Sequence, residues 1–139
     1  MTGLKRSPKM VSISDGLSTL TIECEDHVAY DIPYRISVSV GERFKAQCDD
    51  LFFVVGPDLR EQFKRFERLE ISEVEVPIDE GGFIRVQRES LGAITVQYRI
   101  LDSEIGDICS ITGRIKIDGE WASETLSNLR RIAFSKVME

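Results

Sequence analysis

Apolar and polar side chains alternate along residues 28–40 of this chain, which predicts a β-strand with one dry face and one wet face. A second strand of the same kind is predicted over residues 94–100. Pro33 lies within the first run and cannot donate a hydrogen bond to a neighbouring strand, so it predicts an edge strand or a bulge. The apolar positions are Val28, Tyr30, Ile32, Tyr34, Ile36, Val38 and Val40 in the first run, and Ile94, Val96, Tyr98 and Ile100 in the second.

The chain matches itself after a shift of 64 residues. Residues 21–36 align with residues 85–100 without a gap, and the Tyr-Arg-Ile triplets 34–36 and 98–100 coincide. We interpret this match as an internal structural duplication, with two unrelated segments of similar periodicity as the alternative. A helical spacing of apolar residues also occurs twice, 63 residues apart: Leu59, Phe63, Phe66 and Leu69, then Ala122, Leu126, Leu129 and Ile132.

These elements predict an α+β fold of two pseudo-repeated antiparallel β-meander-plus-helix units, each read as three strands and a helix. A unit of roughly 50 residues buries too little surface alone, so we expect the two units to share one core. The prediction is one domain over 1–139, divided into a polar tail 1–10, a first unit 17–70, a connecting strand or hairpin 71–81 and a second unit 82–136.

The net charge of -6 is unevenly distributed and bears on the class of partner. Residues 18–70 and residues 71–81 each carry about -4, whereas residues 82–139 are nearly balanced. Such a charge repels a phosphate backbone, so we expect no nucleic-acid partner, and an acidic face favours a basic protein. The absence of a long apolar run predicts no membrane span, and the absence of an apolar segment after the basic tail favours the cytoplasm.

The sequence shows no recognisable catalytic or cofactor-binding motif. His27 lies in a short polar stretch, which is typical of a solvated turn, and no nucleophile elbow or phosphate loop occurs. The odd number of cysteines, Cys24, Cys48 and Cys109, favours reduced, buried thiols over disulfides. A zinc site with His27 is the alternative, although paired C-x-x-C motifs are missing. We therefore expect no catalytic residues, metal or cofactor.

Two arginines and one tryptophan are candidate ligand contacts. Arg35 and Arg99 occupy matching polar positions of the aligned segments, so a symmetric anion site across a pseudo-twofold is one interpretation. Exposed arginines that cover strand neighbours are the other. Trp121 opens the second predicted helix, where we expect an anchor packed on the sheet in preference to a binding platform.

Three phrases carry a resemblance to a known family: residues 53–59 entering the first helix, residues 92–96 in the later strand, and the closing residues 117–121. Together with the order of elements, they resemble small bacterial immunity proteins of the WapI type. The resemblance covers most of residues 17–135 and implies a cytosolic protein that binds and blocks a cognate toxin domain.

Charge alone suggests which residues such an inhibitor would use. A basic toxin surface would meet the acidic positions of the first unit, because opposite charges speed encounter. Other classes remain open: a small-ligand regulatory module, a structural or self-assembling protein, and an enzyme whose carboxylates or thiols are not recognisable. The expected partner-binding residues are Glu23, Glu25, Asp26, Asp31, Asp49 and Asp50.

Overall fold

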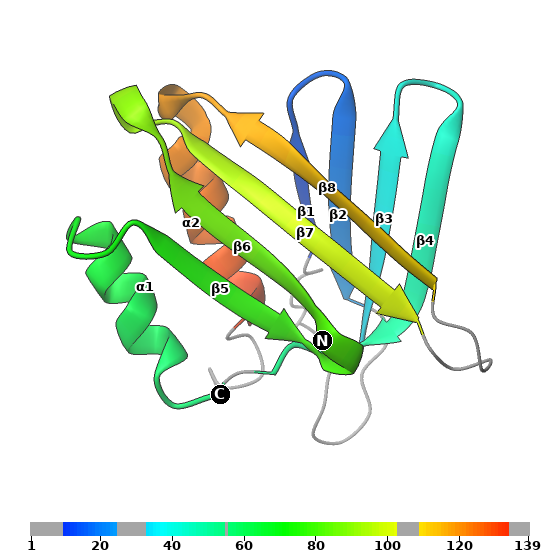
Figure 1. Cartoon of the computed structure of the whole chain (residues 1–139), viewed down its shortest axis with the longest axis horizontal. Coiled ribbons are helices and arrows are strands. Elements are labelled where there is room, and N and C mark those ends of the chain that lie inside the picture. Colours follow the sequence, from blue (N-terminus) through cyan, green and yellow to red (C-terminus); the bar gives the residue numbers. More distant parts are fainter. Residues whose placement is uncertain (1–9, 25–32, 55, 103–108, 134–139) are drawn as a thin grey trace, which may run out of the picture.

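The computed structural model describes residues 10–24, 33–54, 56–102 and 109–133. It contains two four-stranded antiparallel sheets, each followed by a helix (Figure 1). The first sheet, in the order β1-β2-β3-β4, consists of β1 (Met10–Ser14), β2 (Ser18–Cys24), β3 (Tyr34–Val40) and β4 (Phe44–Leu51), and α1 (Leu59–Glu67) follows. The second, in the order β5-β6-β7-β8, consists of β5 (Glu73–Ile78), β6 (Gly82–Arg88), β7 (Ile94–Asp102) and β8 (Cys109–Ile117), and α2 (Gly119–Ala133) follows.

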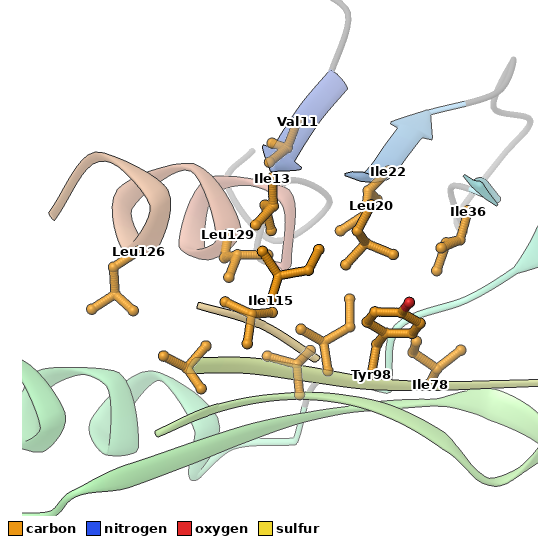
Figure 2. Packing of buried hydrophobic residues seen from close by; sticks show 14 of the residues in the cluster. Val11, Ile13, Leu20, Ile22, Ile36, Ile78, Tyr98, Ile115, Leu126 and Leu129 are labelled. Carbon is orange, nitrogen blue, oxygen red and sulfur yellow. The ribbon is translucent and has the colours of Figure 1, made fainter. Parts of the chain in front are cut away.

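The two sheets face each other across one apolar core. In Figure 2, Leu20 and Ile22 of the first sheet point towards Tyr98 and Ile115 of the second. The period-2 alternation explains this arrangement, since alternate side chains of a strand point to one face of its sheet. Leu20 and Ile22 are 0% exposed, and burying a side chain of this size contributes roughly 1.5–3 kcal/mol to stability.

The helices pack reciprocally on the two units. Helix α1 lies against β5, the first strand of the second sheet, whereas α2 lies against β1, the first strand of the first sheet. Leu59, Phe63 and Phe66 of α1 are buried at a spacing that places them on one helical face. Because the helix of each unit covers a strand of the other, the two units depend on one another for a closed core.

The predicted α+β class with two similar units is confirmed, but each unit has four strands instead of three. The missed strand of the first unit is β1, which begins at Met10, the last residue of the stretch 1–10 that we expected to be a polar tail. Its counterpart in the second unit is β5, which we expected to be a strand or hairpin connecting the two units and not a strand of the second unit. Val11 and Ile13 of β1, like Val74 and Val76 of β5, point into the core.

The ungapped alignment of the two halves is wrong in its third strand. Ile22 pairs with Ile36 in the first sheet, whereas Val86, the counterpart of Ile22, pairs with Val96 in the second. Ile36 therefore corresponds to Val96 and not to Ile100, and the two Tyr-Arg-Ile triplets occupy different positions of the same strand. The cause is loop length, because the β2–β3 connection (25–33) is four residues longer than the β6–β7 connection (89–93).

Two local expectations also differ from the structure. Leu69 is 71% exposed and does not extend the buried face of α1, because the helix ends at Glu67 and Leu69 adopts a left-handed conformation with φ 65°. Pro33 directly precedes β3, which is an interior strand and not an edge. A shift in register between Tyr34 and Ile36 does mark an irregularity beside the proline, as the bulge alternative predicts.

Candidate functional site

A shallow depression of about 370 Å³ lies on the outer face of the first sheet. We call this surface the hydroxyl face, because its central side chains are the short hydroxyl-bearing residues of β2 and β3. The depression lies where these side chains are short, and the longer Lys45 and Gln47 of β4 border it on one side. Alternation with the buried core positions places the hydroxyl-bearing residues, Lys45 and Gln47 on the outward side. The depression is lined by Thr19, Thr21, Ser37, Val38, Ser39, Lys45, Ala46 and Gln47.

Hydrogen bonds tie the hydroxyl face to β1. The Thr19 hydroxyl donates to Ser14 Oγ at 3.0 Å, and Ser12 and Thr21 hydroxyls approach to 3.4 Å across β1 and β2. These cross-strand contacts fix the rotamers of side chains that have little conformational entropy to lose. The surface is therefore a rigid array of hydroxyl donors and acceptors.

A carboxylate cluster, which we call the acidic end, borders the hydroxyl face where β2, β3 and β4 meet. It consists of Glu23, Asp49 and Asp50 around Arg35. Arg35 stands opposite Glu23 in the ladder, and its Nε donates to Asp49 Oδ1 at 2.8 Å. Gln47 Nε2 also donates to Asp49 Oδ1, at 3.3 Å. The three carboxylates outnumber the single guanidinium, so the cluster carries a net negative charge.

The acidic end is exposed and conformationally constrained. The Arg35 and Asp49 side chains are 37% and 46% exposed, so their ion pair contributes little stability by itself. Asp50 adopts φ 58°, in the left-handed region, where the β3–β4 ladder changes register. An aspartate tolerates this conformation better than most residues do. The irregularity places Asp49 and Asp50 side by side at the end of the sheet.

Three of the six expected acidic contacts, Glu25, Asp26 and Asp31, lie outside the described residues, as does His27. The other three, Glu23, Asp49 and Asp50, are brought together in the acidic end. Sequence charge alone singled them out, but their convergence on Arg35 depends on the pairing of three strands.

Arg35 and Arg99 do not line a common cleft. Each lies between buried neighbours on its strand, and each therefore points away from the core on the outer face of a different sheet. The inner faces of the two sheets meet in the core, so Arg35 and Arg99 lie on opposite outer faces. Arg35 is engaged with Asp49, whereas Arg99 stands opposite Phe83 and Thr112.

The cysteines differ in their environments. Cys24 and Cys48 are partly buried and pack against the core, close to the burial that we expected for all three thiols. Cys109, at the start of β8, is exposed, contrary to that expectation. Among the residues that the structure describes, no three His, Cys, Asp or Glu side chains form a group suited to a metal ion. Trp121 is 56% exposed, so it is not the fully packed anchor that we expected.

The outer face of the second sheet carries ion pairs that we did not expect from the sequence. There Arg85 Nη2 donates to Glu75 Oε1 at 2.8 Å, and its Nε lies 3.3 Å from Glu73 Oε2. The Arg85 guanidinium also lies 4.3 Å from the centre of the Phe83 ring. The sequence does contain a sign of this charged face. Glutamates occupy alternate positions over residues 73–77, basic residues occupy alternate positions over residues 114–116, and both sets lie on the outer face of the same sheet.

Asp15 and Tyr98 have shifted pKa values. The backbone N–H groups of Ser18 and Leu17 donate to Asp15 Oδ1 at 2.8 and 2.9 Å, and they hold the pKa of this carboxyl below its ordinary value. Burial raises the pKa of the Tyr98 hydroxyl, and the negative charge of Asp15 adds to the shift. Asp15 lies in the β1–β2 turn of the first sheet and Tyr98 lies in β7 of the second, so this electrostatic interaction acts between the two sheets.

Comparison of the chain with protein-family models, curated proteins and solved structures finds no match. Within the described ranges, neither helix has the length and apolar character needed to cross a membrane.

Proposed function

We propose that this chain is a non-catalytic protein-binding module that presents the hydroxyl face and the acidic end to a basic protein. The immunity-type inhibitor of a toxin domain is the specific form of this proposal. The observation that supports it is the Glu23–Arg35–Asp49 arrangement, in which Arg35 contacts Asp49 at 2.8 Å and stands opposite Glu23, beside a hydroxyl-lined depression. A surplus of carboxylates attracts a cationic surface, and the hydroxyl groups offer hydrogen bonds around it.

The preorganisation of Asp49 favours a binding role for the acidic end. Arg35 and Gln47 both donate to Asp49 Oδ1, so the carboxylate is ordered before a partner arrives. Ordering a side chain in advance lowers the entropy lost on association, which is of the order of 0.5–1.5 kcal/mol for each side chain immobilised. Backbone hydrogen bonds between the strands also order the rest of this sheet face before binding, which lowers the entropy lost on association in the same way.

The proposal predicts that a toxin gene lies beside the gene for this chain, and the direct test uses the toxin domain which that gene encodes. The variant Asp49→Lys/Asp50→Lys reverses the charge of the acidic end, and Glu124→Lys on the exposed face of α2 is the matched control. We expect the double variant to weaken binding by at least about tenfold, with the loss largest at low salt, and to abolish protection of growing cells. The control variant keeps both properties. Equal binding and protection by wild type and the double variant would exclude the acidic end as the interface.

A second candidate function is a module that binds a small polar ligand in the depression. The volume of about 370 Å³ and the lining by Thr21, Ser37 and Lys45 favour it, because hydroxyl groups and one cation suit a sugar or a carboxylate. Thermal denaturation of the full chain with sugars and dicarboxylates separates the two functions. Stabilisation of wild type that Lys45→Ala abolishes supports the ligand module, whereas a Tm unchanged by every compound rejects it for these classes.

A further inference from the structure

Strand β8 forms an edge of the second sheet. It pairs with β7 over its whole length, and among the described residues no backbone hydrogen bond joins it to another strand. Strand β1 approaches β8 without forming a ladder with it. Ser110, Thr112 and Arg114 are exposed, and Ile111 is only partly buried. An edge of this kind presents N–H and C=O groups that a further strand can pair with.

The outer face beside this edge is basic, although the chain as a whole is acidic. Arg114 and Lys116 on β8 stand opposite Gln97 and Thr95 of β7, and Arg99 lies one step further along β7. All three cations lie on the same face, because the alternate positions of both strands point into the core. We call Arg99, Arg114 and Lys116 the basic edge.

Strand β5, at the other edge of the same sheet, shows which kind of strand pairs beside basic side chains in this fold. Strand β5 alternates glutamate with apolar residues, its valines are buried, and Glu73 and Glu75 lie on the outer face. Glu75 is bound by Arg85 of the neighbouring strand at 2.8 Å, with Glu73 at 3.3 Å from the same guanidinium. An acidic and apolar strand beside a basic one is therefore already part of this fold.

We propose that the β8 edge binds an extended peptide segment in which acidic and apolar side chains alternate, added as a fifth strand of the second sheet. Its backbone pairs with β8, its carboxylates lie beside Arg114 and Lys116, and its apolar side chains lie beside Ile111 on the inner side. The backbone supplies affinity and the alternate side chains supply specificity, as in strand addition generally. This surface is distinct from the hydroxyl face, so it adds a second partner to the proposed function.

The test uses the full chain and a fluorescently labelled peptide of alternating glutamate and valine. We expect this peptide to bind, and we expect a lysine and valine peptide not to bind. The variant Arg114→Glu/Lys116→Glu lowers the affinity by at least about tenfold, whereas Lys64→Glu, on the exposed face of α1, changes it by less than about twofold. Loss of affinity in both variants alike would overturn the charge argument.

Two further measurements test the strand pairing itself. A peptide N-methylated at alternate amides cannot complete the ladder and is expected not to bind, and the unmodified peptide is expected to slow amide hydrogen exchange within Cys109–Ile117. Tight binding of the methylated peptide, or exchange unchanged in β8, would overturn strand addition. Sedimentation of the chain alone completes the test: a monomer is expected, and a dimer broken by Arg114→Glu/Lys116→Glu would assign the edge to a second copy and overturn the peptide proposal.

Discussion

Arg130 Nη1 lies 2.7 Å from Glu67 Oε2, and these residues occupy the same position in the two copies of the repeated helix. Phe66 and Leu129, their preceding neighbours, are both buried, which fixes the equivalence. The ion pair therefore joins α1 to α2 at corresponding points of the two units. This polar contact between the two units adds to the apolar core that they share.

The Glu67–Arg130 pair is expected to couple the two helices weakly. Both side chains are 40% exposed, so a double-mutant cycle with Glu67→Ala and Arg130→Ala should give a coupling energy of about 0.2–1 kcal/mol that declines with added salt. Urea denaturation of the four proteins at low and high salt measures it. A coupling energy of zero at both salt concentrations would show that this contact does not stabilise the fold.

Phe66→Ala should be among the most destabilising single substitutions in the chain. The side chain is 0% exposed and its ring lies 4.1 Å below the Arg88 guanidinium, which also donates to the Phe66 carbonyl. Removing the ring leaves a cavity and should cost about 3–5 kcal/mol of unfolding free energy. Phe44→Ala, at a side chain 49% exposed, is the control and should cost less than about 1 kcal/mol. Equal losses in the two variants would contradict the burial pattern.

Gly113→Ala tests the close packing between β7 and β8. Tyr98 stands opposite Gly113, and a Cβ at that position would collide with the Tyr98 ring and hydroxyl. We expect a loss of about 1–3 kcal/mol, because the buried ring must move within a packed core. Gly56→Ala, where a Cβ meets nothing within 4 Å, should be close to neutral. Adding Tyr98→Leu to Gly113→Ala should cost less than the same change in wild type, and strict additivity would contradict the proposed collision.

Asp15 should make stability fall in acid. Its folded-state pKa lies below its unfolded value of about 3.9, so the stabilisation is present above that pH and is lost as the pH falls through the folded pKa. Asp15→Asn retains an oxygen that accepts the N–H bonds of Leu17 and Ser18 but does not titrate. Urea denaturation from pH 7 to pH 3 should show the gap between wild type and variant closing below about pH 4. A gap independent of pH would contradict a depressed pKa.

The sequence predicted much of the fold because the period-2 and helical patterns are strong. Leu20 and Ile22 are apolar at positions that the strand period places on the core face, and the helical period does the same for Phe63 and Leu126. It did not predict β1, because this strand has only five residues and its first residue, Met10, was assigned to the polar tail. It also misplaced the register of the third strand, because a difference in loop length is invisible in an ungapped match.

The candidate site was less accessible to sequence reasoning. The negative charge of Glu23, Asp49 and Asp50 could be counted, but their gathering around Arg35 requires the β2–β3–β4 ladders and the irregularity at Asp50. The hydroxyl face was missed for a similar reason. Serines and threonines at alternate positions look merely polar until two strands bring them together over a depression.

The measurement that tests the proposed function most directly is chemical-shift mapping of the isotope-labelled full chain during titration with the toxin domain that the proposal assigns to it. Binding at the hydroxyl face and the acidic end predicts the largest perturbations at outward residues of β2, β3 and β4, centred on Glu23, Arg35 and Asp49. Perturbations confined to the second sheet, or an unchanged spectrum at saturating toxin, would contradict the proposal.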